Sequence, residues 1–279
     1  MIWEFIKFLF YSGLIVIISK YILVTTLRKL AENLNLNPKT VGNIAGYATS
    51  MPELLTISIS SLSGLISASV FNVLSSNVIN LIQYMGAILL NKNQSSLRNK
   101  AIMLDIILVL ITILIPMILI VTNVSLSLFL VPAFIILYFL FRFLNDKAHN
   151  LYLKDEDEKI EDEIEEEEKN EKGNKIKTIK HVIILIITGV LLFIVGDRLG
   201  NALESLCNIF NISQTIIGIL LGFITSIPEL ITFFEAQKHH KSHDNEMLGV
   251  VEATNNLLTS NILNLFIIQS VGILIVSII

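Results

Sequence analysis

The chain has 279 residues, of which 53% are hydrophobic and only 16% are charged, and its mean hydropathy is +0.71. Soluble domains average about 25% charged residues, so this composition excludes an ordinary soluble protein and indicates a membrane protein with several spans. The formal net charge of −4 is misleading, because 12 of the 24 acidic residues lie between Asp155 and Glu171.

Eight apolar segments follow one another along the chain, each of about 20 residues, the length that a helix needs to cross a bilayer. We therefore expect an all-α, polytopic membrane protein that lies in the lipid bilayer. The predicted spans lie near residues 5–27, 40–64, 67–90, 101–122, 124–144, 179–199, 212–236 and 247–274.

The basic residues predict an orientation. Eighteen of the 20 Lys and Arg residues fall in or near the connections that follow the first, third, fifth and seventh spans. Because cytoplasmic loops are enriched in Lys and Arg, we predict that these connections are cytoplasmic and that the N-terminus is outside the cell membrane. The hydrophilic segment 145–178 would be an acidic cytoplasmic linker, since it cannot bury apolar surface. It separates a first half, 1–144, from a second half, 179–279.

Two sequence motifs, which we call the repeated phrases, each occur twice in the chain. Gly-Tyr-Ala-Thr-Ser-Met-Pro-Glu-Leu is matched by Gly-Phe-Ile-Thr-Ser-Ile-Pro-Glu-Leu, and Asn-Val-Leu-Ser-Ser-Asn-Val-Ile-Asn by Asn-Leu-Leu-Thr-Ser-Asn-Ile-Leu-Asn. The first phrase lies at 46–54 and again at 222–230, and the second lies at 72–80 and again at 256–264. One copy of each falls within the repeat 40–90 and the other within the repeat 212–274. With the predicted topology the two repeats enter the membrane from opposite sides. Inverted repeats of this kind place a binding site near the bilayer midplane.

Glu53 and Glu229 are the strongest candidates for this site. An ionisable residue inside a span is costly and usually faces a polar cavity or a partner, and no basic residue lies near either glutamate in sequence. Pro52 and Pro228 precede them, and a proline inside a helix leaves the carbonyl four residues back without its donor. Carboxylate and carbonyl oxygens that converge in one place are ligands for a hard cation.

Hydroxyl and amide side chains recur at helical spacing around both glutamates. Thr49 lies four residues before Glu53, and Ser76 lies four residues before Asn80. Such side chains can share a helix face with the carboxylate. Taken alone, they more often hold membrane helices together than ligate an ion.

The pattern Thr-Ser-x-Pro-Glu-Leu followed by Ser-Asn-x-x-Asn, present twice and inverted, resembles the α-repeats of the calcium:cation antiporter superfamily, and most closely its sodium/calcium exchanger branch. The resemblance implies a secondary antiporter, not an enzyme, which exchanges Ca²⁺ for Na⁺ and needs no cofactor. It also implies the ion ligands: Glu53, Glu229, Thr49 and Thr225 for calcium, Ser50, Ser76, Ser226 and Ser260 for sodium, and Asn80 and Asn264 in the central site.

Three departures from the family leave alternatives open. Ser75 and Thr259 stand where the family usually has glycine, which could narrow the ion cavity or stiffen the helix packing. Asn264 stands where sodium/calcium exchangers often have Asp, so the site has only two carboxylates and exchange of H⁺ for Ca²⁺ remains open. The last two spans of the family have no counterpart. The chain would then work with eight spans, form a homodimer that covers the flank, or be a scaffold that does not transport.

Other ionisable residues are expected to be structural. We predict that Asp105 and Glu252 are interfacial residues near the cytoplasmic headgroups, although Glu252 could also line an access path. The group His239, His240 and His243 is predicted to lie in a polar connector rather than in a metal site.

Overall fold

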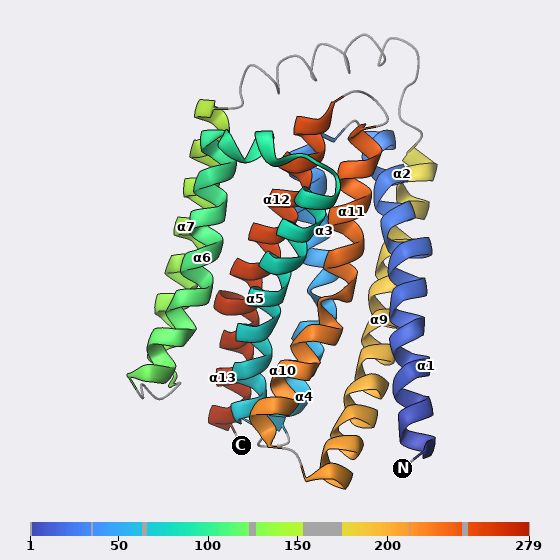
Figure 1. The fold of residues 1–279 in the computed structure, drawn as a ribbon, viewed down its shortest axis with the longest axis vertical. Coiled ribbons are helices and arrows are strands. Elements are labelled where there is room, and N and C mark those ends of the chain that lie inside the picture. The colour runs from blue at the N-terminus through green and yellow to red at the C-terminus, as the bar shows by residue number, and fades with distance from the viewer. Residues whose placement is uncertain are drawn as a thin grey trace.

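A computed structural model describes residues 2–34, 36–62, 66–122, 127–152, 175–211, 213–241 and 245–278. Every regular element in these ranges is helical, and the helices stand side by side along one direction (Figure 1). The prediction of an all-α membrane fold is therefore confirmed. The centre of the acidic linker, 153–174, lies outside the described residues, as do His243 and Asp244.

The described helices form eight rods. They are α1–η1–α2 (Ile2–Ile18, Ser19–Val24, Thr25–Leu34), α3–α4 (Pro38–Thr49, Met51–Leu62), α5 (Ile66–Leu90), α6 (Lys100–Val121), α7 (Leu130–Tyr152), α9 (Lys175–Phe210), α10–α11 (Gln214–Thr225, Ile227–Lys241) and α12–η3–α13 (Glu246–Ile262, Leu263–Ile268, Gln269–Ile278). The short helix η2 (Gln94–Arg98) connects α5 to α6.

Six described stretches are long and apolar enough to cross a membrane by length and composition. They are Ile2–Ala31, Ser69–Leu90, Lys100–Val121, Lys177–Phe210, Gly218–Lys241 and Glu246–Ile278. The two remaining rods are α3–α4, which is interrupted at Ser50, and α7, which carries charged residues toward its end. The expected eight spans thus agree with the arrangement of the helices, although their ends differ.

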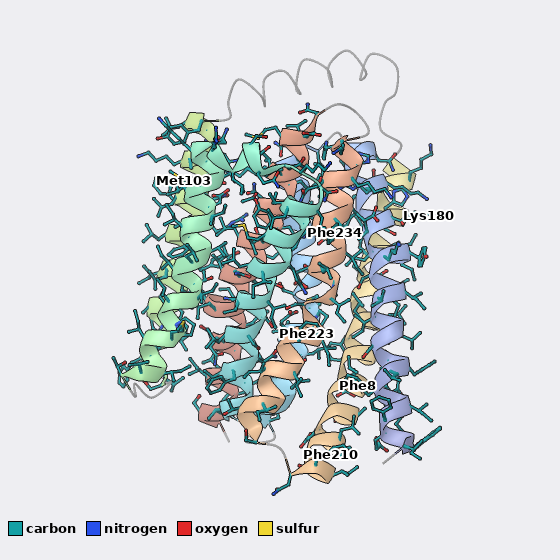
Figure 2. The ribbon with its side chains drawn as sticks, viewed as in Figure 1. Phe8, Met103, Lys180, Phe210, Phe223 and Phe234 are labelled. Atoms are coloured by element: carbon teal, nitrogen blue, oxygen red, sulfur yellow. The ribbon has the colours of Figure 1, made fainter. Side chains whose placement is uncertain are left out.

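The largest differences in span ends concern α7 and α9. The predicted span 124–144 is observed as a helix that continues to Tyr152. It continues because Asn145 and His149 face buried partners on neighbouring helices and not solvent. Helix α9 runs 11 residues beyond the predicted end at residue 199, to Phe210. In Figure 2, Lys180 and Phe210 mark the opposite ends of this helix.

The molecule has two distinct ends (Figure 1). We call the end where α7 stops and α9 starts the linker end, and the end that carries both termini the terminal end. The first repeat starts with α3 at the linker end, whereas the second starts with α10 at the terminal end. The repeats therefore run in opposite directions through the molecule, as the sequence predicted.

The repeats form a central bundle with a pair of rods on each flank (Figure 1). On one flank α1–η1–α2 packs along α9, where Ile15, Leu23, Leu192 and Leu199 are buried. On the other flank α6 and α7 pack together and contact α12 and η3. In the centre α3 crosses α12, and α10 crosses α5. The central bundle is therefore formed by the two segments that carry the repeated phrases.

Glycines allow both central crossings to be close. A Cβ atom on Gly222 of α10 would lie 2.1 Å from Ser75 Oγ of α5. A Cβ atom on Gly46 of α3 would lie 2.8 Å from the Cβ atom of Thr259 on α12. Ser75 and Thr259, which replace the family's glycines, thus fill the helix crossings. Both side chains therefore lie directly against a glycine of the other repeat.

Candidate cation site

Both broken rods change direction at a serine. Ser50 lies between α3 and α4 with φ −81° and ψ 3°, and Ser226 lies between α10 and α11 with φ −79° and ψ 1°. Helical hydrogen bonding weakens at these points because the prolines two residues later have no N–H to donate. Irregular backbone at membrane depth is tolerated only where it is buried in protein or lines a polar cavity.

Glu53 and Glu229 lie in the first turn after each break, and both side chains are fully buried. The Glu53 and Glu229 carboxyl groups lie near each other. Among the described residues, none of the ion pairs involves either glutamate. The breaks therefore bring two acidic side chains together, without a basic partner among the described residues.

Each carboxylate faces the threonine of the other repeat. The Thr225 hydroxyl lies beside the Glu53 carboxylate, and the Thr49 hydroxyl lies beside the Glu229 carboxylate. Neither contact is a well-formed hydrogen bond, because Thr49 Oγ1 donates to the Ala45 carbonyl at 2.9 Å and Thr225 Oγ1 lies 3.4 Å from the Gly222 carbonyl. Both hydroxyl groups therefore keep lone pairs that can face a shared ion.

Ser260 links three of the predicted site residues. Its Oγ donates to Glu229 Oε1 at 3.0 Å and lies 2.9 Å from Ser50 Oγ. It also accepts from Asn80 Nδ2 at 3.3 Å. Its counterpart in the first repeat, Ser76, lies 3.5 Å from Thr225 Oγ1. Both serines thus connect one repeat to the other.

Two asparagines that the sequence interpretation missed hold the centre of the bundle. Asn77 Nδ2 donates to the Asn261 carbonyl, and Asn261 Nδ2 donates to the Asn77 carbonyl, both at 3.1 Å. Their side-chain oxygens accept from Asn80 at 3.1 Å and from Asn264 at 3.3 Å. Asn77 and Asn261 occupy the same place in the repeated phrase, directly after Ser76 and Ser260, and this duplication was the signal that could have identified them.

All ten predicted site residues are buried. Several of their oxygen atoms have no hydrogen-bond partner among the described residues. These atoms are Glu53 Oε1 and Oε2, Glu229 Oε2, Ser226 Oγ, Asn80 Oδ1 and Asn264 Oδ1. Leaving a buried polar atom unpaired costs about 1–3 kcal/mol. Carboxylate, amide and hydroxyl oxygens that lack donors form the ligand set that hard cations such as Ca²⁺ prefer.

Two acidic residues outside the centre are buried and have polar partners. Asp105 is fully buried, where it accepts from Asn145 Nδ2 at 2.9 Å and lies 2.8 Å from His149 Nε2. Both partners belong to α7, so Asp105 has polar partners on a neighbouring helix, which its place near the start of α6 did not reveal. Glu252 is only 5% exposed and pairs with Arg28 of α2.

The expected polar connector with three histidines is partly helical. His239 and His240 lie in the last turn of α11, and His240 Nε2 is 3.1 Å from Glu252 Oε2. In the part of the chain that the structure describes, no group of three or more His, Cys, Asp or Glu side chains could hold a metal ion.

Solved structures with a similar fold are those of the sodium-calcium exchanger NCX_Mj. One, soaked with 10 mM Na⁺ and zero Ca²⁺, has a TM-score of 0.60 and 19% sequence identity, over 99% of this chain and 84% of that chain. Another, soaked with 100 mM Na⁺ and 10 mM Sr²⁺, has a TM-score of 0.61 and 19% identity, over 99% and 83% of the two chains. At this identity the similarity concerns the fold alone.

Comparison with curated proteins found no match. Comparison with family models did find one: the model described as sodium/calcium exchanger protein matches residues 5–145 and 180–279. The two matched segments contain both repeats and leave out the acidic linker. The chain therefore belongs to the sodium/calcium exchanger protein family, whose members are membrane transporters and not enzymes.

Proposed function

We propose that this antiporter exchanges Ca²⁺ for Na⁺ at a site formed by Glu53 and Glu229. The observation that carries the proposal is the pair of buried carboxylates at the two helix breaks, with three of their four oxygen atoms unpartnered among the described residues. Two negative charges neutralise one Ca²⁺ or two Na⁺ ions, so either load would remove the repulsion between the carboxylates.

The remaining ligands would come from both repeats. Thr49 and Thr225 lie beside the carboxylates and would complete the calcium site. Ser50, Ser76, Ser226 and Ser260 would supply sodium ligands, and the unpartnered oxygens of Asn80 and Asn264 would face the central position. Because the repeats start at opposite ends of the molecule, the same site can be reached from either side.

The linker end would face the cytoplasm. Lys39 lies in the first turn of α3, Lys100 begins α6 and Lys241 ends α11. Figure 1 shows these helix ends, and α2 with Arg28, at the linker end. Basic residues are enriched on the cytoplasmic side of membrane proteins.

Exchange of H⁺ for Ca²⁺ is the second candidate. It is favoured by the amides of Asn80 and Asn264, because neither adds a negative charge to the two carboxylates. Two protons would neutralise Glu53 and Glu229 as completely as two sodium ions. The choice between the two candidates concerns the coupling ion and leaves the proposed calcium ligands unchanged.

Calcium uptake into proteoliposomes tests this proposal. We expect uptake when a sodium gradient is imposed and at least a ~100-fold loss in Glu53→Gln and Glu229→Gln, because a charged ligand in a desolvated site contributes several kcal/mol. Asp146→Asn serves as the control, since it removes a carboxylate that is 57% exposed and far from the breaks in sequence.

Three outcomes would contradict parts of the proposal. Uptake that follows a pH gradient and ignores sodium would select the proton candidate. Calcium flux that both glutamine variants retain would exclude the proposed ligands. No flux of either kind, from protein that is monodisperse and folded, would support a scaffold that does not transport.

A further inference from the structure

A line of oxygen-bearing side chains leads from the candidate site toward the linker end. Glu252, Asn256 and Ser260 follow one another at intervals of four residues on α12. Residues four apart share one face of a helix, so this face runs two turns from Ser260 up to Glu252. In the first repeat the position that corresponds to Glu252 is Ala68, so only the second repeat has a carboxylate there.

Arg28 holds the outer end of this line. Arg28 Nη1 donates to Glu252 Oε2 at 2.8 Å, and Arg28 Nη2 donates to Glu252 Oε1 at 2.7 Å. His240 Nε2 of α11 lies 3.1 Å from Glu252 Oε2. The Arg28 and Glu252 side chains are 16% and 6% exposed. A partly buried, two-pronged pair of this kind is among the stronger charge-assisted contacts.

The next position inward is incompletely paired. Asn256 is buried, and its Nδ2 donates to Thr232 Oγ1 of α11. Its Oδ1 has no partner among the described residues. An acceptor oxygen without a donor therefore lies between the Glu252 carboxylate and the Ser260 hydroxyl, which itself bonds Glu229 at 3.0 Å.

The backbone packing indicates which side of this line can open. A Cβ atom on Gly42 of α3 would lie 2.2 Å from the Glu252 carbonyl oxygen, and one on Gly249 of α12 would lie 2.8 Å from Gln237 Cα of α11. At this level α12 is thus in direct backbone contact with both α3 and α11. The contact with α2 is made by the long Arg28 side chain, so separation is easiest there.

We propose that Glu252 is a transient cation-binding position between the central site and the linker end, and that the Arg28 guanidinium occupies it when this end is closed. A permeating Ca²⁺ or Na⁺ ion and Arg28 would then compete for one carboxylate. The proposal rests on the cation exchange proposed above, but its first two tests need no transport. A cation bound at Glu252 would add a step to this exchange, at a residue that lies outside the repeated phrases.

The first test measures access to the line. In a Cys207→Ser background, Asn256→Cys is exposed to a membrane-impermeant cationic methanethiosulfonate from the linker-end side. We expect Arg28→Gln to speed modification about tenfold, because losing one strong contact shifts a two-state equilibrium by about that factor. Lys39→Gln is the matched control, since it breaks another basic–acidic pair at this end, Lys39 with Asp146 at 2.7 Å. Thr232→Cys repeats the test if Asn256→Cys does not fold.

The second test asks whether the freed carboxylate binds a cation. With Arg28→Gln, added Ca²⁺ should slow modification of Asn256→Cys, because an ion bound at Glu252 shields and repels the cationic reagent. Glu252→Gln in the same protein should abolish this protection. Equal modification rates in Arg28→Gln and Lys39→Gln, or protection that survives Glu252→Gln, would overturn the proposal.

The third test uses transport. In vesicles of known orientation, Glu252→Gln should raise the half-saturating Ca²⁺ concentration on the linker-end side about tenfold and leave the opposite side unchanged, as expected for one ligand of an access step. An equal effect on both sides would overturn the proposal. A protein that transports nothing but passes the first two tests would contradict the exchange function and leave the Glu252 position supported.

Discussion

The two repeats carry the same phrases, yet they surround their glutamates differently. Glu229 accepts a hydrogen bond from Ser260 at 3.0 Å. Glu53 has no hydrogen bond to either carboxylate oxygen within the described ranges. The serine that corresponds to Ser260 is Ser76, whose hydroxyl lies 3.4–3.5 Å from the oxygens of Asn72, Gly222 and Thr225. Identical residue types therefore give Glu229 a hydrogen bond from its own repeat and leave both Glu53 oxygens unpaired within the described ranges.

The two central helices that carry these serines also have different neighbours. Helix α12 packs against α6 and α7, where Thr259 accepts from Arg142 at 3.0 Å and Asn255 accepts from Asn145 at 3.2 Å. The corresponding positions on α5 are Ser75 and Phe71, and Ser75 donates to the Phe71 carbonyl of its own helix at 2.6 Å. Helix α12, which carries Ser260, is thus bonded by side chains of α7, whereas the Ser75 hydroxyl bonds within α5 and to the Gly218 carbonyl of α10.

The largest expected difference between the two repeats is in how substitution of each glutamate changes the unfolding temperature of calcium-free protein. Glu53→Gln should raise the unfolding temperature of calcium-free protein by a few degrees, because removing an unpaired buried charge relieves about 1–3 kcal/mol. Glu229→Gln should change it less, since Gln can still accept from Ser260. Differential scanning fluorimetry in chelator measures both variants. A larger rise of the unfolding temperature in Glu229→Gln than in Glu53→Gln would contradict this prediction.

Calcium should stabilise the wild-type protein in the same assay, because a ligand that binds only the folded state adds to its stability. Both glutamine variants should lose this stabilisation. A variant that keeps it would retain a calcium site without that carboxylate.

A smaller difference is expected between the two serines. Ser260→Ala should raise the half-saturating Ca²⁺ concentration about tenfold, since it removes a hydroxyl bonded to a charged group, worth about 1.5–3 kcal/mol. Ser76→Ala should have an effect of about threefold or less, because its contacts of 3.4–3.5 Å are long for hydroxyl hydrogen bonds. Isotopic calcium exchange in vesicles measures both. Equal effects would mean that the ion-bound site is more symmetric than this structure.

The smallest difference is expected where the structure is symmetric. Asn77 and Asn261 donate to each other's carbonyl groups at the same distance, 3.1 Å. Asn77→Ala and Asn261→Ala should each cost about 1–3 kcal/mol, because each leaves a buried carbonyl without its donor. Thermal unfolding of the two variants should agree within about 0.5 kcal/mol, the size of ordinary surface effects. Unequal losses of stability in the two variants would show that the two repeats differ at the centre of the bundle as well.

Much of the fold could be predicted because its determinants are local. Apolar length specified the number of rods, and the duplicated phrases specified the inverted repeats. Proline and glutamate side by side specified the breaks at Ser50 and Ser226. These features depend on hydrogen bonding within one helix and on the absence of water in the bilayer, so a single sequence contains them.

The partners of polar side chains could not be predicted in this way. Asp105 is fully buried beside Asn145 and His149, which lie 40 and 44 residues away in the sequence. Arg28 and Glu252 are 224 residues apart and form a two-pronged pair. Such contacts depend on which helices become neighbours, and the spacing along any one helix does not encode that.

By itself, the sequence determined the residue types of the site and their duplication. Only the tertiary structure decided that the two copies are unequal. The hydrogen bond that Glu229 receives and Glu53 lacks depends on the direction of a serine hydroxyl. The surroundings of the two helices differ too, since Asn255 of α12 accepts from Asn145 of α7 and Phe71 stands at the corresponding position of α5. Two copies of one phrase become different half-sites because their neighbours along and across the bundle differ.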